Sequence, residues 1–176
     1  MLLKGKKMAF LGLLLAVTLI LIILSGVFEF NTLFLLAAAS FSVGIAFREY
    51  GVSLGVGFYI ASIILGLILA PNKFYMVTYA AMGLYIVCRE LAWTLLDKAK
   101  NKRKPIIVYG LLKYIIFNMI YIPIIIFMPK FIYHGTINTG LTIVFIMGGQ
   151  VGLFVFDKVY DYFQIRIWSK IRSRLE

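Results

Sequence analysis

Residues 8–28 read MAFLGLLLAVTLILIILSGVF, a long apolar run without a single charged side chain. About 20 apolar residues are needed to cross the hydrocarbon core of a bilayer, which is roughly 30 Å thick. The run follows Lys4, Lys6 and Lys7, as the core of a secretory signal peptide would. A signal-peptide core has only about 7–15 residues, however, so we interpret this run as a retained transmembrane helix.

The rest of the chain repeats this pattern. Hydrophobic residues make up 62% of the 176 residues and charged residues 14%, whereas soluble domains are roughly 45–50% apolar. The sequence therefore predicts an all-α integral membrane protein, a single polytopic membrane domain over residues 1–176. Its six transmembrane helices are expected at residues 8–28, 32–47, 51–70, 74–91, 105–128 and 141–156.

The positions of the basic residues predict the orientation. Nearly all of the 18 Lys and Arg lie in the N-terminal segment, after the second and fourth runs, or in the C-terminal segment. Lys73 and Lys130 lie in the alternate loops, and Lys113 lies inside the fifth run. Because cytoplasmic loops are enriched in Lys and Arg, we expect both termini in the cytoplasm. The short loops and the uncleaved first run favour a bacterial plasma membrane. The net charge of +11 would suggest nucleic acid in a soluble protein, but here the basic residues lie between apolar runs, so we expect an anionic lipid surface as the partner.

The C-terminal stretch combines apolar and basic residues at helical spacing. Its apolar positions predict one stripe on a helix over about 158–175, and they are Tyr160, Phe163, Ile167, Trp168, Ile171 and Leu175. The other positions include Arg166, Lys170, Arg172 and Arg174. This pattern is typical of an amphipathic helix lying on the cytoplasmic leaflet. There are two alternatives. The segment is a basic tail that only fixes topology, or it is a helix that docks on a partner protein through Arg166, Lys170 and Arg174.

No enzyme signature is present. The single histidine excludes the HExxH zinc motif, and neither a GxSxG elbow nor a GxxxxGK[ST] phosphate loop occurs. The acidic residues fall at or beyond the ends of the apolar runs, which argues against a proton relay at the membrane midplane. Cys88 has no second cysteine and is interpreted as a packing residue. We expect no catalytic residues, no cofactor and no metal site.

Polar residues inside the runs are candidates for ligand contacts. Lys113 is expected either to snorkel to the membrane interface or to face a substrate. Our first interpretation of Asn118 is a structural hydrogen bond between helices, and our second is a ligand contact. If the outer loops fold over a cavity, a small-molecule site is expected near the outer face. Its candidate residues are Asn72, Lys73, Tyr75, Asn118, Tyr121, Tyr133, His134, Asn138 and Gln150. A tight turn is the simpler explanation of residues 71–73, and an exposed loop that of His134.

The first run also carries a face of small residues, Gly12-x-x-x-Ala16 with Ala9 one turn earlier. With this face and six short-looped spans, the whole chain resembles the substrate-binding S components of energy-coupling-factor (ECF) transporters. The resemblance implies a six-helix bundle that binds a vitamin-like small molecule near its outer face. It also implies that a membrane coupling protein and two ATPases provide the energy, with Ala9, Gly12 and Ala16 at the coupling interface.

A second interpretation uses the same topology without transport. The chain is also similar to the six-span rod-shape protein of the bacterial elongation machinery, a non-enzymatic membrane scaffold. This interpretation predicts no ligand-sized outer cavity and a basic tail that binds partners. A membrane-embedded enzyme is the third interpretation, but the sequence lacks the clustered catalytic groups that it would require.

Overall fold

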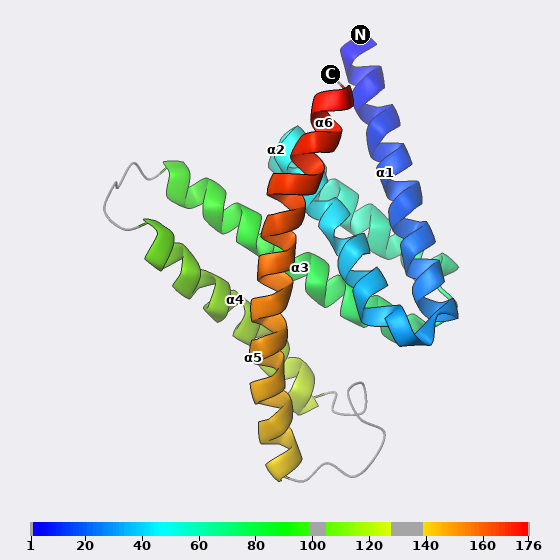
Figure 1. The fold of residues 1–176 in the computed structure, drawn as a ribbon. Helices are drawn as coiled ribbons and strands as arrows, with labels where there is room; N and C mark the ends of the chain where they lie inside the picture. Colours follow the sequence, from blue (N-terminus) through cyan, green and yellow to red (C-terminus); the bar gives the residue numbers. More distant parts are fainter. Residues whose placement is uncertain (1, 99–104, 128–138, 176) are drawn as a thin grey trace. The chain divides into compact units, whose positions relative to one another are not determined.

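The structure, a computed structural model, describes residues 2–98, 105–127 and 139–175, which are helical almost throughout and include no strand (Figure 1). The prediction of an all-α protein is confirmed. The elements are α1 (Leu2–Val27), η1 (Glu29–Asn31), α2 (Thr32–Leu69), α3 (Lys73–Lys98), α4 (Pro105–Phe127), α5 (Thr139–Tyr162), the π-helical η3 (Phe163–Trp168) and α6 (Ser169–Leu175). They form two compact units, Met1–Leu112 and Lys113–Glu176.

Four of the described helical segments are long and apolar enough to cross a membrane. They are Gly5–Val27, Thr32–Leu69, Ile107–Ile126 and Gly140–Arg172. The chain is therefore a helical membrane protein by length and composition, as predicted. The six predicted spans do not appear as six separate candidates, because residues 32–47 and 51–70 lie in the one helix α2 and α3 is not among the four.

The helix α2 is interrupted at Gly51. This residue has φ 84° and ψ 179°, a non-helical conformation between two helical halves. Backbone at these angles is almost confined to glycine, because a Cβ would collide with neighbouring backbone atoms. The sequence predicted a boundary between two helices at this position. In the structure this boundary is the single non-helical residue Gly51 and not a loop.

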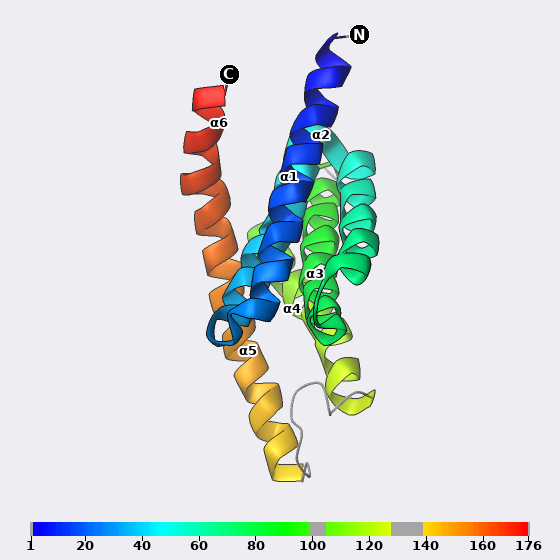
Figure 2. The ribbon, with the colours of Figure 1, turned by 90° about the vertical axis from the view of Figure 1, so that its right-hand side faces the viewer.

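The second half of α2 folds back along the first half (Figure 2). A Cβ built on Gly55 would lie 2.3 Å from the ring of Phe47, although a straight helix would keep residues eight positions apart well separated. At the far end, Pro71 packs on Gly26, so the second half returns to the C-terminal end of α1. The two halves of α2 therefore form a helical hairpin.

The core of the first unit lies between α1, α2 and α3. Its buried residues are Ile22, Leu36, Ala39, Ala70, Met76 and Tyr79. Polar groups inside it are satisfied locally, because the hydroxyls of Ser62 and Tyr79 share a hydrogen bond of 2.6 Å and Tyr59 donates to the carbonyl of Ala80. Phe10 contacts Tyr50 with ring centroids 6.0 Å apart, so the hairpin apex lies beside the N-terminal half of α1.

In the second unit the last span and the tail are one helix. The sequence predicted a span ending near residue 156 and a separate amphipathic helix over 158–175, but α5, η3 and α6 follow one another without a break (Figures 1 and 2). A separate helix over 158–175 is not confirmed, because Asp157 and Lys158 end the apolar run without ending the helix. No Gly or Pro follows them before residue 175 to do so.

The predicted apolar stripe of the tail is also only partly right. Tyr160, Gln164 and Trp168 are buried at a spacing of four residues, whereas Ile167 and Ile171 are 42% and 43% exposed. The burial of Gln164 needs no change of helical spacing, because residues 160, 164 and 168 are four apart and share one face of a helix. The predicted stripe left Gln164 out because its side chain is polar.

The turn at Gly51 gives the first testable prediction. Gly51→Ala should destabilise the protein by about 1–3 kcal/mol, because alanine is strained at this φ and ψ. Gly57→Ala is the matched control in the same helix, since its Cβ would meet no atom within 4 Å and alanine favours a helix over glycine. Thermal unfolding in detergent should give a lower midpoint for Gly51→Ala alone. Equal midpoints for the two variants would contradict the assigned turn.

Candidate functional site

The turn between α2 and α3 carries three of the predicted ligand contacts, and the structure uses them internally. The Asn72 side-chain oxygen accepts a 2.9 Å hydrogen bond from the Phe74 backbone N–H, at the start of α3. The Lys73 ammonium donates to the carbonyls of Leu67, Ile68 and Ala70 at the end of α2. Tyr75 is half-buried against the core of the first unit. This geometry favours the simpler explanation of a structured turn.

Three further candidates meet between α4 and α5 in the second unit. Gln150 donates a 2.7 Å hydrogen bond from its amide nitrogen to the side-chain oxygen of Asn118. Asn118 in turn donates to the Tyr114 carbonyl within α4. The Tyr121 hydroxyl donates to the Phe145 carbonyl at 2.9 Å, and its ring lies so close to Gly149 that any Cβ there would collide. Asn118 therefore holds two helices together, which agrees with its first interpretation.

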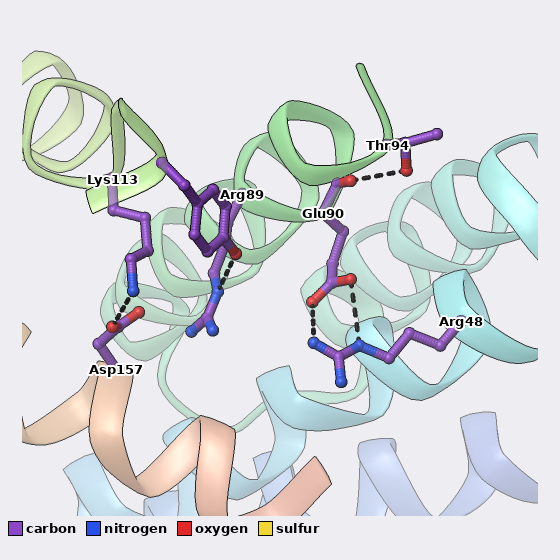
Figure 3. Close-up of polar contacts among 7 residues, drawn as sticks. Arg48, Arg89, Glu90, Thr94, Lys113 and Asp157 are labelled. Atoms are coloured by element: carbon purple, nitrogen blue, oxygen red, sulfur yellow. Dashed lines mark hydrogen bonds and ion pairs between the residues drawn. The ribbon is translucent and has the colours of Figure 1, made fainter. Parts of the chain in front are cut away.

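Lys113 forms an ion pair that the sequence analysis did not identify. Its ammonium contacts the carboxylate of Asp157, and the two side chains are 16% and 15% exposed (Figure 3). Together with Asn118–Gln150 and Tyr121–Phe145, this pair sets an antiparallel register between α4 and α5. The expectation that Lys113 either snorkels or faces a substrate did not include an acidic partner. Asp157 was assigned to a span end, although it lies inside the Gly140–Arg172 candidate span.

A second ion pair joins α2 to α3 beside the Gly51 turn. Arg48 donates from Nε and Nη2 to the two carboxylate oxygens of Glu90, at 3.1 and 2.8 Å (Figure 3). The Glu90 side chain is 6% exposed and that of Arg48 is 36% exposed. A bidentate arginine–carboxylate pair fixes orientation as well as distance. The pair therefore holds the apex of the hairpin against α3.

Arg89, the neighbour of Glu90, is almost completely buried, with 1% of its surface exposed. Its Nε donates a 2.9 Å hydrogen bond to the Tyr109 hydroxyl of α4 (Figure 3). The Tyr109 ring also packs edge-on against Trp93, with centroids 5.1 Å apart. The sequence analysis did not single out Arg89 and counted it only as one of the 18 Lys and Arg residues used for the orientation. One sequence feature could have pointed to this residue. An Arg-Glu dipeptide lies at the end of an apolar run at residues 48–49 and again at residues 89–90.

The remaining outer-face candidates, Tyr133, His134 and Asn138, lie outside the described residues. The described candidates for ligand contact therefore comprise Asn72, Lys73 and Tyr75 in the first unit and Asn118, Tyr121 and Gln150 in the second. Of these six, every one except Tyr75 makes a hydrogen bond within its own unit.

The small-residue face of α1 is exposed. Ala9, Gly12 and Ala16 all lie at the surface, and a Cβ on Gly12 would meet no atom within 4 Å. The opposite face of α1 is buried and includes Leu11, Leu14, Thr18 and Ile22. The candidate interface for a partner is therefore not used by the described part of the chain itself.

In the tail, Arg166 and Lys170 are exposed, whereas the side chain of Arg174 lies outside the described part. Gln164 is 4% exposed, and neither its amide nitrogen nor its oxygen makes a hydrogen bond to a described residue. An unsatisfied buried amide is costly, and π-helical turns often occur at functional positions. The sequence analysis left Gln164 out of the apolar stripe because its side chain is polar, although it lies four residues from both Tyr160 and Trp168 and so shares their helical face.

Within residues 2–98, 105–127 and 139–175, no group of three or more His, Cys, Asp or Glu side chains is arranged to hold a metal ion. Cys88 is a half-buried free thiol. Comparison with protein-family models, curated proteins and solved structures finds no match to this chain. Function therefore has to be argued from its own residues.

The Arg48–Glu90 pair gives the second testable prediction. Arg48→Gln should destabilise the protein by about 3 kcal/mol, because it leaves the buried Glu90 carboxylate without its partner. Glu90→Gln should cost less, because the exposed side of Arg48 can be hydrated. The double variant should cost less than the sum of the two single changes in a double-mutant cycle of unfolding free energies.

Lys6→Gln is the control for this cycle, since it removes an exposed cation from the same unit and should change stability by no more than about 0.5 kcal/mol. Additive effects of Arg48→Gln and Glu90→Gln would contradict the pairing.

Proposed function

We propose that this chain is the small-molecule-binding subunit of a bacterial membrane transporter that is energised by separate ATPase subunits, as in ECF transporters. The observation that carries the proposal is the exposed small-residue face of α1, at Ala9, Gly12 and Ala16. In lipid, helices associate chiefly by close packing, which small side chains permit. A face of this kind on the surface of a packed helical unit suits docking on another membrane helix.

The proposal includes six crossings of a bacterial plasma membrane with both termini in the cytoplasm. The fold-back at Gly51 supports two crossings within α2, because each half is close to the about 20 residues that one crossing needs. Arg48–Glu90 and Arg89–Tyr109 support a crossing by α3, since they give its charged groups partners. The distribution of Lys and Arg supports the orientation.

This proposal has fewer candidate ligand contacts than the sequence suggested. Asn72, Lys73, Asn118 and Gln150 are engaged in hydrogen bonds that shape the protein. The aromatic Tyr75 and the outer-loop residues Tyr133, His134 and Asn138 remain as candidate contacts. Aromatic walls with a few polar groups are usual in small-molecule sites.

The internal use of these polar groups favours a second candidate, a non-enzymatic membrane scaffold of a cell-envelope or cell-shape complex. A scaffold needs exposed docking faces but no ligand cavity. The face of α1 and the basic end of α6 would then bind envelope proteins. Partner identity separates the two candidates, because only the transporter subunit needs ATPases and a small molecule.

Affinity purification of the tagged full-length protein from mild detergent tests the proposal, with mass spectrometry of bound proteins and bound small molecules. We expect a membrane coupling protein, two ATPases and a stoichiometric small molecule. Recovery of cell-wall or cell-shape proteins with no small molecule would overturn the transporter and support the scaffold.

The docking face is tested by the double variant Gly12→Leu and Ala16→Leu, which should reduce recovery of the coupling protein at least tenfold. Bulky side chains there block close helix packing, and a Cβ at Gly12 has no atom of the described chain within 4 Å. Val17→Leu is the matched control, since Val17 is 45% exposed and lies off this face. Equal recovery with the double variant and the control would remove α1 from the docking interface.

A further inference from the structure

The helical run that ends the chain is too long to lie within a bilayer. Its membrane-spanning candidate, Gly140–Arg172, has 33 residues, which at 1.5 Å per residue is about 50 Å of helix. The hydrocarbon core is roughly 30 Å thick. Containing the run would need a tilt of about 50°, beyond the usual range of about 0–40° for transmembrane helices. Part of the run therefore extends beyond the hydrocarbon core, and the charged residues, which begin at Asp157, place that part at the C-terminal end.

The exposed surface of that extension is basic and apolar at once. Of its charged residues, Lys158, Arg166, Lys170 and Arg172 are exposed, and Asp161 is the one acidic residue between them. Ile165, Ile167 and Ile171 are exposed by 66%, 42% and 43%. Only one row, formed by Tyr160, Gln164 and Trp168, is buried.

Lys158 marks the level at which the run leaves the apolar part of the membrane. The residues before it include Val151, Phe154 and Val155, which are exposed by 65%, 55% and 53%. The Lys158 ammonium lies over the Phe154 ring, 5.7 Å from its centroid. A lysine at a membrane border places its stem along apolar groups and its charge among the headgroups. Basic side chains follow it over the next three to four turns.

We propose that residues 158–172 bind the headgroups of anionic phospholipids where the helix leaves the membrane. Charge complementarity identifies the partner, because the exposed charges are almost all positive and arginine pairs well with phosphate oxygens. The arrangement of the apolar residues also favours lipid over protein. A helix that docks on one protein presents one apolar stripe. Here Ile167 and Ile171, four residues apart, share one face, whereas Ile165 lies on the opposite side of the helix, and cations alternate with these isoleucines.

The inference depends on the helical run and its charges, and not on transport or scaffolding. It differs from the sequence-based expectation of a helix lying flat on the leaflet. Here the helix passes through the headgroup layer end-on and contacts lipid on several sides. Its binding should select phosphatidylglycerol over phosphatidylcholine and should weaken as salt screens the charges.

Native mass spectrometry of the full-length protein, titrated separately with phosphatidylglycerol and phosphatidylcholine of the same acyl chains, tests this proposal. We expect a preference for phosphatidylglycerol that falls with rising ionic strength. In the variant K158Q/R166Q/K170Q/R172Q, the ratio of phosphatidylglycerol binding to phosphatidylcholine binding should be at least tenfold lower. R166K/R172K should retain it, because both cations remain.

The control variant K6Q/K7Q removes two exposed cations from α1 and should keep the preference. An equal loss in this control would overturn the proposal, because attraction would then follow net charge alone. A preference that is independent of salt in the unmodified protein would also overturn it, even if the fourfold variant does not fold. If the fourfold variant keeps its lipid preference but loses a co-purifying protein, the surface is a protein interface and the proposal fails.

Discussion

The reversal of the chain at Gly51 is the constraint on which the rest of the first unit depends. The 38 residues of α2 would make a rod of about 57 Å if they were straight, nearly twice the thickness of the hydrocarbon core. The positive φ of Gly51 converts this rod into two antiparallel halves. Only then can Ala70 join Leu36 and Ala39 in one core, and only then does α3 begin beside the end of α1.

The polar side chains follow from the same environment. Lipid offers no hydrogen bonds, so a charged or amide group inside a span needs a partner within the protein. Arg48, in the candidate span of α2, pairs with Glu90 of α3, and Lys113 and Asp157, both in candidate spans, pair in the second unit. Side chains paired in this way fix the register between helices, and the structure assigns them no chemical role. The small-residue face of α1 and the basic residues 166, 170 and 172 of the last helix remain exposed.

Local patterns predicted the helices well, and contacts between distant residues poorly. Apolar runs located α1, α4 and both halves of α2, and the break at residues 48–51 was anticipated because the run of small apolar residues ends at Arg48-Glu49. The ion pairs join residues 42 and 44 positions apart, which no local periodicity can reveal. The extension of α5 was missed because charge ends an apolar run without ending a helix. Asn72 and Lys73 were expected at a ligand site, but their roles depend on carbonyl and N–H groups that only the folded turn brings close.

A distance across α2 tests the central claim most directly. Spin labels on cysteines at residues 33 and 69, both exposed leucines in the native chain, can be measured by double electron–electron resonance in a Cys88→Ser background. The hairpin predicts a distance below about 25 Å, because packed helices lie about 8–10 Å apart and the label arms add the rest. A straight α2 would separate the two positions by about 54 Å, and a distance near that value would contradict the account.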